Sequence, residues 1–169
     1  AIKGKDPYLI GIASHSYADT WAHQNFIGGW HEHNSFKHFP ATIIPSIGHA
    51  DVLDKPDLVA VRWKDKRLIE PLVSNNLRFL DAACALYSEY LQLGYEPLID
   101  VELLRAYLKK IFGKECSYHN LLFRSLGRRK RIKMYNALMH KLCGEKIRKY
   151  DRNLWLDEAV VFHDGSAKF

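Results

Sequence analysis

Cysteine is scarce in this sequence. The 169 residues include three cysteines, Cys84, Cys116 and Cys143, and no two of them have a CxxC spacing. An odd number of cysteines without that spacing argues against both a zinc finger and a disulfide framework. Because cysteine is among the residue types most often buried, we expect three free thiols in the interior.

Long apolar runs are absent as well. No run approaches the roughly 18 to 20 apolar residues that a membrane-spanning helix needs. The first residues, AIKGKDPYLIG, have neither the apolar centre of a signal peptide nor an initiator Met. These features favour a cytoplasmic location, with a removed signal peptide as one alternative and the later part of a longer chain as another. They say nothing about the oligomeric state.

No strand pattern with reliable alternation is present either, whereas helical periodicity is frequent. Apolar residues recur at helical spacing in five segments, with Gly or Pro at several of their ends: residues 8–24, 68–93, 97–112, 119–144 and 151–162. The segment 119–144 has a candidate break at Gly127. The pattern predicts a single all-α domain over residues 1–169, lacking an upstream part if the chain continues a larger domain.

One long segment interrupts the helical pattern. Residues 25–57 contain Gly28, Gly29, Pro40, Pro45, Gly48 and Pro56, all of which disfavour a long helix. An irregular stretch of this length in a compact domain is usually functional. We therefore expect it to line a site.

Basic residues exceed acidic ones. The net charge is +6 and the pI is near 9.2, with the excess concentrated at Lys64–Arg67, in RRKRIK (residues 128–133) and in KIRKYDR (residues 146–152). Such a balance is compatible with a phosphate-containing or other anionic partner. A solvated helical face is the simpler interpretation of each basic run.

Histidine supplies the strongest signal. Six of the nine histidines lie within residues 15–49: His15, His23, His31, His33, His38 and His49. In the stretch HSYADTWAHQ, His15, Asp19 and His23 recur every four residues on one face of a helix. The outer two are about 12 Å apart along the axis, too far to share one ion. The spacing therefore favours Asp19 as a carboxylate that bridges two metals.

Further oxygen and nitrogen donors follow in the irregular segment. IGHADVLDKPD contains His49, Asp51, Asp54 and Asp57, and GGWHEHNS contains His31 and His33. A zinc ion needs about four donors, so this segment is the obvious source of the rest. The other histidines, His38, His119, His140 and His163, are expected to be structural or surface residues.

These motifs resemble those of a known superfamily. YLIGIASHSYADTWAHQNF with IGHADVLDKPD is similar to the zinc-dependent phospholipases C, including glycosylphosphatidylinositol-specific phospholipase D, and at longer range to the single-strand-specific zinc nucleases. Closer still, the chain resembles an uncharacterised bacterial all-α family with the same His-x3-Asp-x3-His helix and an NN-x-RF helix, here Asn75, Asn76, Arg78 and Phe79. The resemblance covers roughly residues 8–90.

The resemblance implies a phospholipase C-like helical fold and a zinc site of one to three ions. It implies the metal ligands His15, Asp19, His23, His49 and Asp57. The nearby His31 is a further candidate ligand. Leu53 stands where the superfamily often has an acidic ligand. Asp51 or Asp54 could take its place, or the site could hold fewer metals.

Three functions follow as alternatives. The first is metal-assisted hydrolysis of phosphate esters, with Asp54 or Asp57 as the group that takes a proton. The second is a non-catalytic helical protein with a structural metal site. The third is a nucleic-acid-binding module that uses Arg128–Lys133 with Tyr135, although no base-reading motif accompanies these residues.

Overall fold

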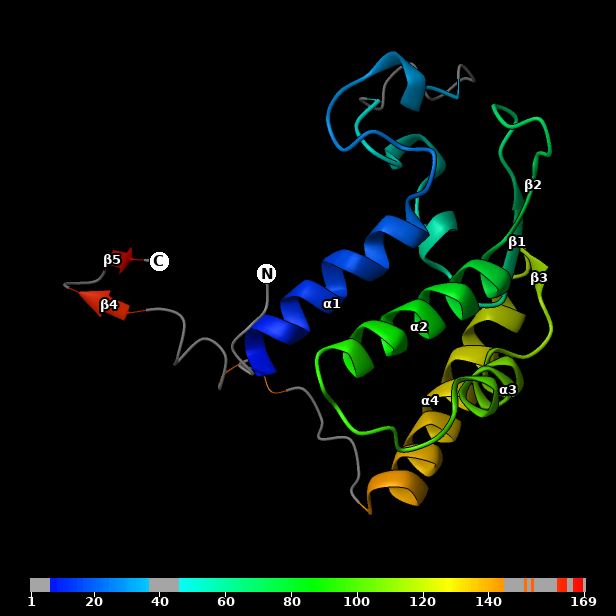
Figure 1. Cartoon of the computed structure of the whole chain (residues 1–169). Helices are drawn as coiled ribbons and strands as arrows, with labels where there is room; N and C mark the ends of the chain where they lie inside the picture. Colours follow the sequence, from blue (N-terminus) through cyan, green and yellow to red (C-terminus); the bar gives the residue numbers. More distant parts are fainter. Residues whose placement is uncertain are drawn as a thin grey trace. The chain divides into compact units, whose positions relative to one another are not determined.

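The computed structural model describes residues 7–36, 46–144, 151, 153, 161–163 and 166–168 (Figure 1). The chain divides into two compact units, with the boundary between Ile132 and Lys133. All the residues that form the candidate site belong to the first unit.

Four long helices are present in the described part of the chain: α1 (Pro7–Ala22), α2 (Asn75–Gln92), α3 (Val101–Phe112) and α4 (Leu121–Cys143). Side-chain oxygens cap two of them, since Ser74 Oγ accepts a hydrogen bond from Leu77 N and Asp100 Oδ1 accepts one from Leu103 N. Three of them lie within segments that the periodicity predicts to be helical, and α1 begins one residue before its predicted segment. The break considered at Gly127 is wrong, because α4 continues through it.

The prediction of an all-α fold is wrong. A three-stranded sheet with the order β2-β1-β3 is formed by β1 (Val61–Lys64), β2 (Leu72–Ser74) and β3 (Cys116–Ser117). Strand β1 pairs antiparallel with β2 and parallel with β3. A second pair, β4 (Val161–His163) and β5 (Ser166–Lys168), is antiparallel and belongs to the second unit. The described chain is therefore a mixed α and β structure.

The sequence contains the physical reason for this error. Val61 and Trp63 are buried while Arg62 and Lys64 are exposed, which is the period-two pattern of a half-buried strand. Pro71 has no N–H for a helical hydrogen bond, so the helix predicted for residues 68–93 cannot form as a whole. Its first part forms β2 instead, and α2 begins only at residue 75.

The last predicted helix, residues 151–162, is also partly wrong. Residues 161 and 162 belong to β4. Residues 152 and 154–160 lie outside the described residues, as do residues 37–45 with His38.

The irregular segment contains three short 3-10 helices rather than a long helix. They are η1 (Glu32–Asn34), η2 (Ala50–Val52) and η3 (Lys55–Asp57). The prediction that residues 25–57 hold no long helix is thus confirmed for the described part. Buried Asn34 stabilises this segment, because its side-chain oxygen accepts from Ile27 N and its amide donates to the carbonyls of Ile27, Gly29 and Ser46.

The core joins this segment to the sheet. Val52 from η2 is packed with Val61, Trp63 and Val73 from β1 and β2. Burial of such side chains stabilises a fold by roughly 1.5 to 3 kcal/mol each. Helix α2 packs against both α1 and α3 (Figure 1). The core thereby holds Phe26, which follows α1, and Val52 and Leu58 of the irregular segment against the sheet, and α2 also contacts β1.

No helix among the described residues is both long enough and apolar enough to cross a membrane. The three cysteines are free, as predicted. The expectation that they are buried is wrong, because Cys84 and Cys116 are half-buried and Cys143 is exposed near the end of α4.

Candidate metal centre

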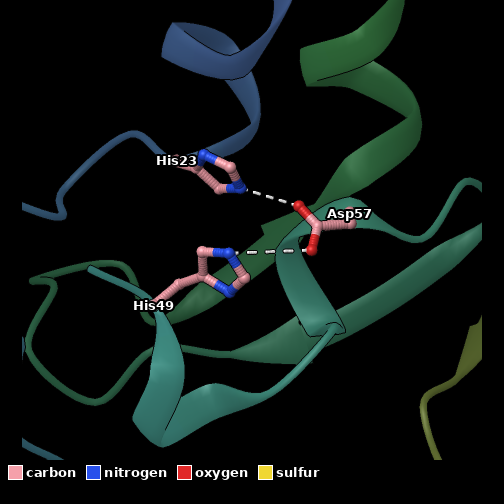
Figure 2. A group of neighbouring side chains, drawn as sticks. All are labelled: His23, His49 and Asp57. Atoms are coloured by element: carbon pink, nitrogen blue, oxygen red, sulfur yellow. Dashed lines mark hydrogen bonds and ion pairs between the residues drawn. The ribbon is translucent and has the colours of Figure 1, made fainter. Parts of the chain in front are cut away.

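Three side chains from separate parts of the chain converge on one point. Figure 2 shows the carboxylate of Asp57 facing the imidazoles of His23 and His49. His23 Nε2 lies 2.7 Å from Asp57 Oδ1, and His49 Nε2 lies 3.8 Å from Asp57 Oδ2. The donor atoms of all three residues lie within 4.8 Å of one another. One carboxylate oxygen therefore faces each histidine.

His23 is held at the end of α1. The helix ends at Ala22, which is buried, and His23 N still donates to Asp19 O. His23 O accepts from Phe26 N, which turns the chain away from the helix axis. The His23 side chain thus projects from a fixed helix end toward η3.

His49 is oriented by a backbone carbonyl. Its Nδ1 lies 2.8 Å from Leu53 O. A carbonyl only accepts hydrogen bonds, so Nδ1 carries a proton, and Nε2 is the ring nitrogen that faces Asp57. This is the arrangement usual for a histidine that binds a metal, in which the second ring nitrogen donates to a neighbouring oxygen.

Leu53 supplies that carbonyl from an unusual backbone conformation. Its φ is 57° and its ψ is −139°, in a region that residues with a side chain rarely occupy and that costs of order 1 to 3 kcal/mol. Leu53 N also donates to Ala50 O at the end of η2. The strained turn between η2 and η3 therefore directs a carbonyl at His49.

Asn75, the first residue of α2, holds the backbone on either side of Asp57. The Asn75 amide donates to Lys55 O and Leu58 O at 2.6 and 2.8 Å, which brackets Asp57 on both sides. Asn75 Oδ1 accepts from Trp63 Nε1 at 3.0 Å. The Asn75 side chain is fully buried, so each of these hydrogen bonds lies away from water and is hard to replace.

Arg78 adds a second support one helical turn later. One of its guanidinium nitrogens lies 2.7 Å from Asn75 Oδ1 and 3.4 Å from Pro56 O. Burial lowers the pKa of Arg78 from its ordinary value, while the charges of Asp57 and Asp65 act in the opposite direction. Arginine remains a cation in proteins, so Arg78 provides positive charge behind the Asp57 carboxylate.

Aromatic rings close the other side of the group. The rings of His23 and His49 are stacked, with centroids 4.3 Å apart and planes 14° apart. Phe26 contacts His49 edge to face at 6.2 Å. The Arg67 guanidinium lies 4.3 Å from the centroid of the Phe26 ring and 4.4 Å from that of Phe36. These contacts fix the ring planes of the two histidines.

Arg67 is itself anchored by a buried carboxylate. It makes two hydrogen bonds to Asp65, whose side chain is 1% exposed, at 2.9 and 2.7 Å. It also donates to His33 O at 2.7 Å. Through Arg67, the turn between β1 and β2 therefore holds the rings of Phe26 and Phe36 in place.

The three donors suit a metal ion. In a tetrahedral zinc site with bonds of about 2.0 to 2.2 Å, ligand atoms lie roughly 3.3 Å apart. The separations of 2.7 and 3.8 Å from the two histidines to Asp57 bracket that value. The side chains of His23, His49 and Asp57 are 27%, 31% and 42% exposed. An ion can therefore reach them and keep a position open to solvent.

His15 and Asp19 lie apart from this group. They form a pair with each other on α1, with His15 Nε2 3.5 Å from Asp19 Oδ2 and side chains 80% and 48% exposed. Of the four-residue stripe, the structure brings only His23 to the other donors. The helical spacing predicts that Asp19 is the carboxylate between two histidines. In the described residues Asp57 has that place, between His23 and His49.

The remaining predicted residues also have other contacts. His31 is the N-cap of η1, where its Nδ1 accepts from His33 N. Asp54 Oδ1 accepts a hydrogen bond from the Tyr118 hydroxyl at 2.6 Å. Asp51 Oδ2 accepts from Phe36 N, and its other oxygen is buried without a hydrogen-bond partner among the described residues.

Sequence reasoning missed the supports of the site. Asn75 and Arg78 stand out in the sequence only through the family resemblance, although adjacent asparagines at a helix start are a signal for side-chain to backbone hydrogen bonds. Asn76 has such a role too, because its side chain accepts from Ala60 N and donates to Gly113 O. No sequence signal links Arg67 to Phe26, since the two are joined only by the fold.

A small pocket adjoins the two histidines. Its volume is about 420 Å³, and apart from His23 and His49 its lining is uncharged: Phe26, Ile27, Gly28, Ile47, Gly48 and Ala50. Gly48 has a φ of +52°, and nothing lies within 4 Å of where its Cβ would be. The pocket offers room for an uncharged group beside the metal donors.

Comparison with protein-family models matches residues 1–168 to a family of unknown function (DUF6765). Comparisons with curated proteins and with solved structures gave no significant match.

Proposed function

Because the chain belongs to this family of unknown function, we propose a function from the metal centre: metal-dependent hydrolysis of phosphate esters, with zinc held by His23, His49 and Asp57. The observation that carries the proposal is a carboxylate placed between two imidazoles, all three open to solvent. Nitrogen and oxygen donors of this kind suit zinc.

An open site favours catalysis over a structural role. Structural zinc is usually enclosed by four protein ligands, whereas catalytic zinc has three protein ligands and a position for water or substrate. The group His23, His49 and Asp57 offers three donors, and their exposure leaves one side accessible. This argues against the non-catalytic alternative.

The chain's own groups have defined tasks in this proposal. A bound zinc ion would lower the pKa of a coordinated water to about 7 and stabilise charge on a phosphoryl oxygen. Asp57 has two oxygens, so one can hold the ion while the other accepts a proton. The Arg78 cation lies close enough to Asp57 for the carboxylate charge to raise the pKa of the guanidinium, against the larger lowering by burial. Asp54 remains a predicted proton acceptor, three residues away and hydrogen-bonded to Tyr118.

The pocket beside the histidines indicates which part of the substrate lies there. Its uncharged lining would accept an apolar or neutral ester group rather than a second phosphate. The net charge of +6 favours association with an anionic substrate. A phosphate diester with at least one uncharged substituent satisfies both features.

Metal analysis and hydrolysis should be measured on the same preparations. The protein, purified without chelators and resupplied with zinc, is expected to retain at least one ion per chain and to hydrolyse bis(4-nitrophenyl) phosphate. Asp57→Asn keeps the shape of the side chain but removes its charge, and it should lose both properties. His33→Gln, an exposed histidine outside the group, is the matched control and should retain both.

Two results would contradict the proposal. The proposal fails if the wild-type protein holds no stoichiometric metal after zinc is resupplied. A chain that binds one ion tightly but hydrolyses no phosphate ester supports the structural metal site instead.

A further inference from the structure

A second cavity lies away from the metal centre. Its volume is about 850 Å³, and it is bordered by β1, β2, the start of α2, the end of α3 and the segment that contains β3. None of the three metal donors lines it. Its size is within the usual range for a small-molecule site.

Basic side chains from separate segments meet at this cavity. Lys55 comes from η3, Lys64 from β1, Lys109 from α3, and Lys114 from the loop that follows α3. His119 lines it as well. The lining therefore carries an excess of positive charge, which attracts an anion.

The single acidic residue of the lining is already occupied. Glu115, with a side chain 9% exposed, pairs with Arg62 at 3.0 Å. Its other oxygen accepts hydrogen bonds from the Ser74 hydroxyl and from Asn76 N. Glu115 therefore has no capacity left to neutralise the lysines.

Three of the lysines lack a partner among the described residues. Lys64, Lys109 and Lys114 are exposed and make no ion pair there. Lys55 differs, because its ammonium group lies 5.1 Å from the centroid of the Tyr118 ring. Lysine binds phosphate as a flexible point charge, so these groups can turn toward an anion.

Two exposed leucines also line the same cavity. Leu72 and Leu77 both line it and are 54% and 60% exposed. Two leucines this exposed beside one cavity offer a surface for the carbon skeleton of a ligand. A lining that contains both lysines and exposed leucines favours a ligand with an anionic group and an apolar part.

We propose that this cavity binds a small organic phosphate, in which a dianionic phosphate contacts Lys64, Lys109 and Lys114 while an apolar or aromatic body lies on Leu72 and Leu77. The proposal is independent of the metal centre. It also differs from nucleic-acid binding by residues 128–133, which do not line the cavity.

The test uses 1-naphthyl phosphate as the probe and isothermal titration of the chain after chelation of metal. Binding is expected, and it should be tighter than that of inorganic phosphate or of 1-naphthol because the probe uses both parts of the cavity. The double variant Lys64→Ala/Lys114→Ala should weaken probe binding on the order of tenfold or more, because each charge-assisted contact contributes substantially. Leu77→Ser should weaken binding of the probe but not of inorganic phosphate.

Matched controls separate the possible outcomes. Lys130→Ala/Lys133→Ala removes the same charge from α4 and should leave the affinity unchanged, as should Asp57→Ala, which tests independence from the metal centre. Equal losses from both lysine pairs would mean that net charge alone governs binding and would overturn the proposal. Absence of binding would do the same. If the chain binds a single-stranded oligonucleotide but not the probe, and Lys64→Ala/Lys114→Ala weakens that binding, the proposal is overturned and the ligand of the cavity is nucleic acid.

Discussion

His23 Nε2 lies 2.7 Å from Asp57 Oδ1, although the two residues are 34 positions apart in the sequence. This contact joins the end of α1 to η3. It places an aspartate from the irregular segment, rather than one from the same helix, beside the histidine. The relationship gives Asp57 and Asp19 different expected roles, which makes them a useful pair of variants.

Asp57→Ala should weaken zinc binding on the order of 100-fold or more, because even loss of an outer partner of a metal ligand costs 10 to 100-fold. Asp19→Ala should change the affinity little, since Asp19 pairs with exposed His15. Competition with a fluorescent zinc chelator measures both affinities. A larger loss from Asp19→Ala than from Asp57→Ala would support the bridging role that the helical spacing predicts for Asp19.

The members of the candidate donor group could be predicted from the sequence, but not their arrangement. His23, His49 and Asp57 are all candidates because histidine and aspartate are concentrated in two segments. The four-residue spacing describes neighbours along one helix and contains no information on contacts between segments. The fold provides those contacts through buried Asn75 and through the packing of Val52 against Trp63. Similarly, the helices follow from periodicity, whereas strands of two to four residues carry too short a pattern to outweigh a neighbouring helical one.

Asn75→Ala should destabilise the protein by about 3 kcal/mol, because Lys55 O, Leu58 O and Trp63 Nε1 would lose a buried partner. Urea unfolding followed by tryptophan fluorescence measures the change in the free energy of unfolding. Zinc affinity of the folded variant should fall as well, because η3 is no longer held on both sides of Asp57. Gln92→Ala, at the exposed last residue of the same helix, is the control. Equal stability of the two variants would contradict this role for Asn75.

Arg67→Ala should destabilise the fold by about 3 kcal/mol or more, because it leaves Asp65 buried without its cation. Adding Asp65→Asn to Arg67→Ala should recover part of that loss, since the uncompensated charge is then gone. Arg67→Lys should retain charge but lose the paired hydrogen bonds and the planar contact with Phe26 and Phe36. Thermal denaturation of the four proteins measures these differences. If Asp65→Asn added nothing to the stability of Arg67→Ala, the buried charge would not be the cause.

Leu53→Gly should raise the free energy of unfolding by about 1 kcal/mol, although it removes a whole side chain. Glycine adopts a positive φ without the strain that Leu53 carries at φ 57°, and that relief outweighs the greater freedom of glycine in the unfolded chain. The Leu53 side chain is 55% exposed, so its loss removes little buried surface. Zinc affinity should be unchanged, because His49 donates to the backbone carbonyl and not to the side chain. Leu93→Gly, at a leucine that is 38% exposed and has a φ of −77°, should instead lower stability. If both substitutions destabilise the protein equally, the backbone at Leu53 carries no strain. If zinc affinity falls in Leu53→Gly, the turn orients His49 only when a side chain restricts it.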